Sequence, residues 1–171
     1  MAERSDVIAF GTINRWLAGD KVTTKTGMLV GAVTLAEFTV EKIVEIKKGT
    51  NLIPGDVIYL PTMGGMSSSE LAARTPRNLQ ALVYLGDEMT AEDLTVDEAY
   101  VVERGDPAAA GAPRRMPQSS QGFVVVDQDN PNLLIWPALG NVAEGALEDV
   151  LPGGRLDGLT EDQRYSVCIT K

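Results

Sequence analysis

Apolar and polar residues alternate along several segments of the chain, which is the pattern of strands whose two faces meet different surroundings. The alternation is clearest in residues 32–48, where Phe38, Val40, Val44 and Ile46 fall on one face. Such a segment exceeds the usual strand length, and a strand this long can bend and serve two sheets, as barrels require. We therefore expect one long, bent strand here.

Shorter segments rich in apolar and β-branched residues predict further strands. They cover residues 6–14, 57–60, 78–85, 100–103, 122–127, 133–136 and 165–170. Residues 17–27 are polar and predict a loop or an exposed ribbon. Residues 105–120 contain three prolines and predict a long loop, whose length suggests a docking role.

Turn and helix signals separate these strands. Pro54 and Gly55 suit the two central positions of a type II turn. Ser67 followed by Glu70 forms a capping box and predicts a helix over residues 68–74, ended before Pro76. A second helix is expected over residues 143–151.

About seven short strands, two short helices and many turns predict a mainly β barrel or sandwich. A chain of 171 residues is roughly one domain. We assign residues 1–153 to a single β-barrel domain and residues 154–171 to a C-terminal tail or an extra edge strand.

Charge and composition exclude several functions. The chain has 24 acidic and 15 basic residues, a net charge of −9, which disfavours nucleic acid and anionic membrane as partners. It has no histidine, the commonest general base and metal ligand. Its single cysteine, Cys168, excludes an internal disulfide and a thiolate metal cage.

No apolar run approaches the 18 or so residues of a membrane helix, so we expect no membrane insertion. The N-terminus is charged, and its apolar stretch at residues 7–10 is too short for a signal peptide. We favour an extracellular location, with the leader absent from this chain.

The familiar catalytic motifs are missing. Triads with a serine or cysteine nucleophile need a histidine, and neither glycine-rich phosphate-binding motif occurs. The segment 54–59 resembles a strand of self-cleaving repressors and signal peptidases, which use a serine before a lysine, but after Ser67 only Lys171 remains. We therefore predict no catalytic residue, no cofactor and no metal.

Carboxylates leave two alternatives open. Residues 127–132 resemble the start of a calcium loop, although turn chemistry explains the same residues. A carboxylate- or metal-dependent hydrolase would draw on Asp127, Asp129, Glu148 or Asp149. That hypothesis requires two of these carboxylates to converge in a concave pocket.

The order of residues 6–12, 38–44, 54–58 and 82–85, continued by 121–125, 136–137 and 145–149, is similar to uncharacterised secreted proteins of actinobacteria. Residues 11–13, 38–44 and 54–56 also resemble the OB-like barrel of netrin-type and tissue-inhibitor modules. Those modules use disulfides and an N-terminal cysteine, which this chain lacks, so the inhibitor function does not carry over. The resemblance implies an OB-like barrel of about six to seven strands and export, and it brings no catalytic residue.

The leading hypothesis is a non-catalytic protein that acts through protein–protein interaction or assembly. A surface-layer component and a phage capsid decoration protein are versions of it. The partner would be a neutral or basic protein, or further copies of the chain in a homo-oligomer. Exposed connections are where such a barrel would act, and the candidate contact residues are Trp16, Met63, Pro107, Pro113, Arg114 and Arg115.

Overall fold

The computed structural model describes residues 5–47, 49–62, 66–75, 77–89, 99–109, 113–118, 122–136 and 141–156. In these residues, nine strands form one sheet. The strands are β1 Val7–Thr24, β2 Leu29–Ile46, β3 Val57–Thr62, β4 Leu79–Met89, β5 Tyr100–Glu103, β6 Arg114–Pro117, β7 Phe123–Val126, β8 Leu133–Trp136 and β9 Asn141–Glu144. The helical elements are α1 Ser68–Arg74 and two 3₁₀ turns, η2 Pro107–Ala109 and η3 Leu147–Val150.

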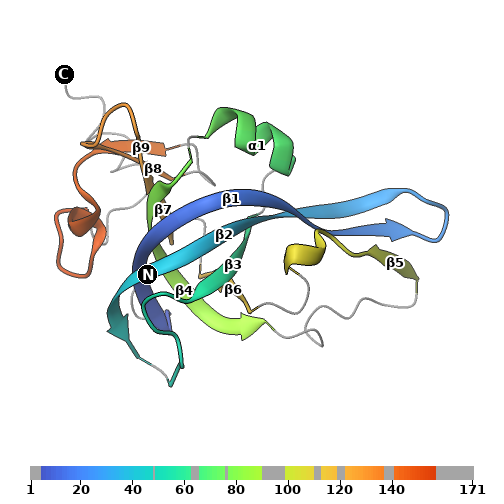
Figure 1. Ribbon diagram of the computed structural model, residues 1–171, viewed down its shortest axis with the longest axis horizontal. Coiled ribbons are helices and arrows are strands. Elements are labelled where there is room, and N and C mark those ends of the chain that lie inside the picture. The colour runs from blue at the N-terminus through green and yellow to red at the C-terminus, as the bar shows by residue number, and fades with distance from the viewer. Residues whose placement is uncertain are drawn as a thin grey trace.

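Part of the sheet is ring-like. The strand order is β5-β1-β2-β3-β6-β4-β7-β8-β9, and β1 also pairs with β4. The pairing of Val7–Ile13 with Leu85–Leu79 therefore joins two strands that the sheet order separates. All the ring pairs are antiparallel except β3 with β6, which are parallel. The ring curves around the main core, with α1 above it and β7–β9 at one end (Figure 1).

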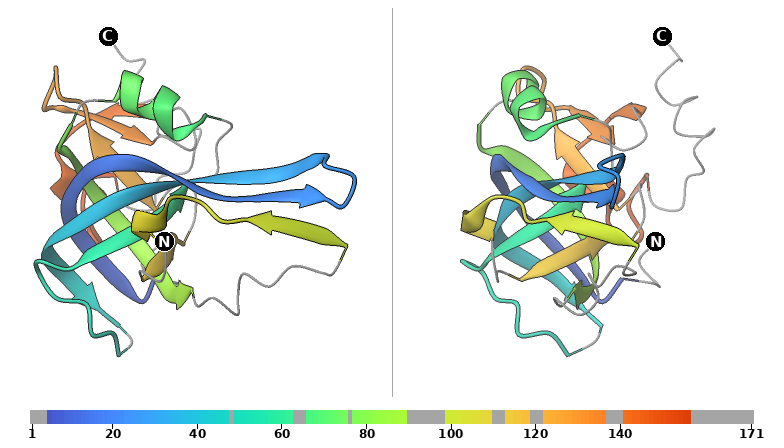
Figure 2. Two further views of the ribbon diagram at one scale, coloured as in Figure 1. Left: turned by 45° about the vertical axis from the view of Figure 1, so that its right-hand side comes forward. Right: turned by 90° about the vertical axis from the view of Figure 1, so that its right-hand side faces the viewer.

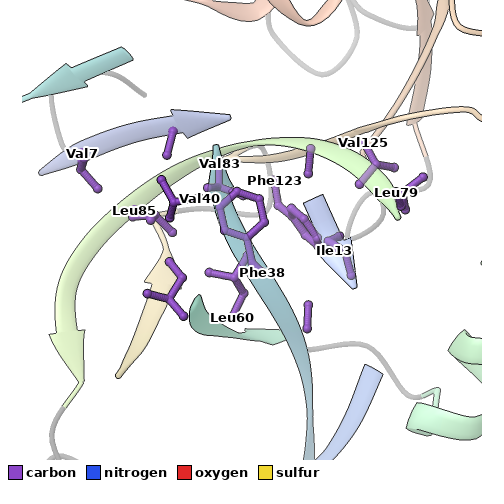
Figure 3. Packing of buried hydrophobic residues seen from close by; sticks show 14 of the residues in the cluster. Val7, Ile13, Phe38, Val40, Leu60, Leu79, Val83, Leu85, Phe123 and Val125 are labelled. Atoms are coloured by element: carbon purple, nitrogen blue, oxygen red, sulfur yellow. The ribbon is translucent and has the colours of Figure 1, made fainter. Parts of the chain in front are cut away.

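The main core fills the inside of this ring because alternate residues of its strands point inward. From β4 these residues are Ala81, Val83 and Leu85, and all three are fully buried. Phe38 of β2 lies among side chains from β1, β3, β4 and β7 (Figure 3). Phe38 thus lies in the middle of the main core.

A second core covers the other face of β4. Leu82 and Tyr84, which alternate with the inward residues, pack against Leu134, Trp136 and Val150. The Tyr84 hydroxyl donates a 2.6 Å hydrogen bond to the Val150 carbonyl, which ties η3 to the sheet. Because both faces of β4 are covered from Ala81 to Leu85, all five of these residues are apolar.

Several sequence predictions are confirmed. The chain is mainly β, and α1 spans residues 68–74 with Ser67 and Glu70 in a capping box. Gly55 has a φ of 98°, and the Asp56 N–H donates to the Ile53 carbonyl, as a type II turn requires. The strands at residues 122–127 and 133–136 form the expected hairpin, β7 with β8.

Other predictions are wrong. The described residues form a nine-stranded sheet that is partly ring-like, not the predicted barrel of six or seven strands, and they contain one α-helix rather than two. The expected loop at residues 105–120 contains the strand β6. Its sequence has no apolar alternation, and it is a strand because it pairs with β3 and β4. The expected helix at residues 143–151 is the end of β9 followed by η3, because β8 pairs with Asn141–Glu144. The strand expected at residues 165–170 lies outside the described residues.

Leu156 is fully buried in the second core, so packed structure continues past residue 153. In the described residues, we find no helix with the length and apolarity that crossing a bilayer demands.

We predict that Gly11→Ala destabilises the protein by about 2 kcal/mol or more. A methyl group at Gly11 would overlap the Thr39 carbonyl oxygen and lie 2.6 Å from Phe38 Cζ, so β1 and β2 would have to separate. Gly49→Ala is the matched control, because a methyl group there meets no atom within 4 Å and the φ of Gly49 is not in the left-handed region. Urea unfolding of the control should change by less than about 0.5 kcal/mol, and equal losses for the two variants would contradict the packing described here.

Candidate interaction surface

The β1–β2 hairpin continues beyond the ring as a projecting arm. We define the arm as residues 21–33 together with β5, which pairs with Lys21–Thr24 of β1. The arm points away from the β7–β9 end of the molecule (Figure 1), and a second view shows β5 running alongside the hairpin (Figure 2). The arm is therefore a three-stranded sheet, β5-β1-β2, attached to the body at one end.

Apolar side chains are exposed on the arm. Of the ten large apolar side chains that are exposed in the described residues, five belong to the arm, although it holds 17 residues. They are Met28, Leu29, Val30, Tyr100 and Val101. Leu29 is 59% exposed and Met28 is 66% exposed. Scattered apolar residues on a surface are ordinary, but a cluster on one projecting element indicates an interaction site.

The cross-strand register places these residues on both faces of the arm. Leu29 of β2 and Val101 of β5 both pair with Thr23, so they lie on the same face. Tyr100 pairs with Thr24, the neighbour of Thr23, and therefore faces the other way. An isolated hairpin is only marginally stable in water, so a thin sheet with apolar residues on both faces gains from being covered.

One edge of the arm is also open. β3 pairs with β2 only from Thr34 to Thr39. On the side away from β1, Leu29–Val33 therefore has no paired strand in the part of the chain that the structure describes. Residues 26–36 contain no charge and no proline, the side chains that usually protect an exposed edge. The β1–β2 pairing shifts register at both ends of this segment, opposite Val30 and opposite Val33. This edge can accept the backbone hydrogen bonds of an added strand.

An ionic cluster joins the arm to the body at its root, which we define as Asp20 and the residues that contact it. The Asp20 carboxylate, which is 7% exposed, accepts hydrogen bonds from Arg104 and Arg114 at 3.1 Å and from the Gly105 N–H at 2.9 Å. Burial raises the pKa of Asp20, but the hydrogen bonds from Gly105, Arg114 and Arg104 outweigh burial and hold the pKa below its usual value. Asp20 thus joins β1 to β6 and to the chain that follows β5.

A small apolar cluster lies beside these charges. Leu17, Leu35, Tyr59 and Ala109 are buried together. The Tyr59 hydroxyl lies 3.2 Å from both Glu37 Oε2 and the Ala108 carbonyl oxygen, and burial followed by the Glu37 charge raises the pKa of Tyr59. The arm is therefore joined to the body both by this buried apolar cluster and by the ion pairs of Asp20.

The six candidate contact residues predicted from the sequence lie in different parts of the structure. The half-buried Trp16 donates its indole N–H to Thr75 at 2.6 Å, at the end of α1. Pro107 and Pro113 are exposed, and Met63 lies outside the described residues. Arg114 belongs to the Asp20 cluster.

Arg115 is turned inward. It donates to the Gly86 carbonyl and to Thr50, both at 2.9 Å, and lies 3.5 Å from Glu88. Together with Pro113 it lines an open hollow of about 660 Å³ between residues 49–58 and the end of β4. Arg114 and Arg115 are thus committed to contacts within the chain.

Carboxylates gather in this hollow, but they are not the four that the hydrolase hypothesis requires. The lining carboxylates are Asp6, Asp56, Asp87 and Glu88. No three acidic or cysteine side chains in the described ranges are arranged to hold a metal ion together.

The hydrolase candidates lie elsewhere. Asp127 accepts the N–H groups of Asp129 and Asn130 and so closes the β7–β8 turn. Asp149 accepts the Ala146 N–H and pairs with Arg155, and these contacts, the Ala146 bond first, lower its pKa. The convergence in a pocket that the hydrolase hypothesis requires is therefore not seen for these carboxylates.

The sequence predicts the arm only in part. Residues 17–27 are predicted to be a loop or an exposed ribbon, and the exposed β1–β2 hairpin agrees with the second alternative. The long strand is predicted to begin at residue 32, but it begins at Leu29. The uncharged run from Met28 to Val33 is the signal that could have identified the arm, since it extends the apolar pattern past the turn. Comparison of the chain with protein-family models, with curated proteins and with solved structures finds no match.

We predict that Asp20→Asn destabilises the protein by about 3 kcal/mol at pH 7, because it leaves the largely buried Arg114 guanidinium without a counter-charge. The pKa of Asp20 is lower in the folded than in the unfolded chain. The stability it contributes is therefore present above about pH 4 and is lost as pH falls through the folded pKa. Unfolding curves of wild type and variant should converge below pH 4.

Asp129→Asn is the control for this prediction, because Asp129 is exposed on a turn. Its free energy of unfolding should stay within about 0.5 kcal/mol of wild type. A gap between wild type and Asp20→Asn that is the same at pH 3 and pH 7 would show that the Asp20 charge does not stabilise the root.

Proposed function

We propose that this chain is a non-catalytic protein that acts through protein–protein contact or assembly, and that the arm is its contact surface. The observation that carries the proposal is the arm itself, which exposes Met28, Leu29 and Val30 on an element whose base is packed and ion-paired to the body. A rigid apolar projection loses little conformational entropy on binding, so it is suited to docking.

The order of strands in the ring supports a finer proposal, that this part of the fold is OB-like. In an OB fold, five strands form a partly open barrel, and ligands bind the loops that join strands 1 to 2 and 4 to 5. In chain order the five ring strands here are β1, β2, β3, β4 and β6. The corresponding connections are the β1–β2 hairpin and the segment that carries β5, which are the two parts of the arm.

Charge favours a protein as the partner. OB folds commonly bind oligonucleotides, but this chain carries a net charge of −9, which repels phosphate backbones. The arm carries Lys21, Lys25 and Glu103, a net charge of +1. Its exposed side chains are mainly apolar, and an apolar contact with few charges is typical of the centre of a protein interface.

Photo-cross-linking in the native host tests this function. A photo-reactive amino acid in place of Val30 should give a discrete protein adduct, because this side chain would lie within the contact. The same amino acid in place of Val142 is the matched control, since Val142 is also exposed but lies on β9 at the other end of the sheet. The two yields would be compared on denaturing gels.

A discrete adduct from position 30 that is absent from position 142 supports the proposal. Equal yields from the two positions, or none from position 30, would overturn it.

A further inference from the structure

The open edge of the arm is self-complementary. If two copies pair antiparallel and each uses all five residues of Leu29–Val33, the two-fold axis passes through Gly31. Leu29 of one copy then lies opposite Val33 of the other, and Val30 lies opposite Ala32. Every pair is apolar, and at the axis two glycines meet. The paired segments therefore contain no like charges that would repel, and a second copy of the chain can supply the added strand.

The presence of glycine at residue 31 is explained by a position on the two-fold axis and not by the structure of one copy. Its φ is not in the left-handed region, and a Cβ built on it meets no atom within 4 Å. Neither a tight turn nor close packing inside the chain thus requires a glycine here. A glycine in a strand often marks a place where another backbone approaches.

Charge also favours a second copy as the occupant. The arm carries +1 while the whole chain carries −9, so the remaining residues carry −10. Antiparallel pairing brings the arm tip of each copy, with Lys25, toward the root of the other copy, whose residues outside the arm carry the opposite net charge. The five-residue overlap, at about 3.4 Å per residue, keeps the two bodies about 17 Å apart, beyond the ~8 Å over which charges interact at physiological salt.

The other edge of the arm is less suited to pairing. β5 is four residues long and ends at Glu103, which pairs with Lys21 at 3.8 Å, and Arg104 follows it. Charged side chains of this kind protect edges from pairing with other chains. The β2 edge has no such charge.

From these observations we infer that the chain forms a symmetric dimer by antiparallel pairing of Leu29–Val33 with the same segment of a second copy. This inference rests on the proposed function and names the partner. It gives a continuous six-stranded sheet, β5-β1-β2 joined to its symmetry mate, in which the apolar faces of the two arms are adjacent.

Site-specific disulfide formation tests the register. In a Cys168→Ser background, Gly31→Cys places two thiols across the two-fold axis with Cα atoms about 4.5–5.5 Å apart, a distance that a disulfide spans. Under mild oxidation of the purified chain we expect most of the protein to become a dimer. The product has twice the 18.3 kDa mass of the chain on a non-reducing gel.

Val101→Cys in the same background is the control. Val101 is exposed on the same arm, but it would lie at least about 24 Å from its mate, because five strand spacings of about 4.8 Å separate the two β5 strands. It should remain monomeric under conditions that link Gly31→Cys. Linking through Val101→Cys instead, or equally through both positions, would overturn the inferred pairing.

Sedimentation velocity of the full chain gives a second measurement that needs no cysteine. Val30→Lys places a charge on the edge and should weaken self-association at least tenfold, whereas Val142→Lys should leave it unchanged. Added salt should weaken association of the wild type, because the arm and the body carry opposite charge.

The outcomes separate the inference from the function. A purified chain that stays monomeric, together with an arm-specific adduct to a different protein in the cross-linking experiment, would overturn the dimer and leave the proposed function standing. Loss of arm-specific adducts altogether would overturn both.

Discussion

The structure depends on the fact that one strand, β1, belongs to both the body and the arm. Its first half pairs with β2 on one side and β4 on the other, which draws the sheet into a partial ring. Its second half pairs with β2 and β5 and forms the arm. Because the backbone hydrogen bonds run through both halves, the direction of the arm is set by the curvature of the ring.

This arrangement requires β1 and β2 to approach closely where the ring curves. At Gly11 the space that a side chain would need is taken by Phe38 and the Thr39 carbonyl. Phe38 in turn fills the middle of the main core. The curvature, the position of Phe38 and the projection of the arm therefore depend on one another, and the contacts of Asp20 with Arg104, Gly105 and Arg114 tie the base of the arm to the body.

The contrast between body and arm is also thermodynamic. In the body, β4 is covered on both faces, and its apolar residues stabilise the fold by being removed from water. In the arm, apolar residues of the same types are exposed and contribute little to the stability of one copy. Residues that do not stabilise the isolated chain are free to serve recognition, which is why the arm and not the core is the candidate surface.

The sequence by itself determined the local structure: the capping box from Ser67 to Glu70, the type II turn at Pro54–Gly55, and most of the strands that are apolar at alternate positions. These features depend on residues a few positions apart, so the pattern of neighbours is sufficient. Only the tertiary structure decided the polar strand β6, the short β9, the root contacts of Asp20 with Arg104 and Arg114, and the open edge at Leu29–Val33. Each of these depends on pairing between residues far apart in the chain, and local pattern carries no record of which distant strand supplies a partner or of where that partner stops.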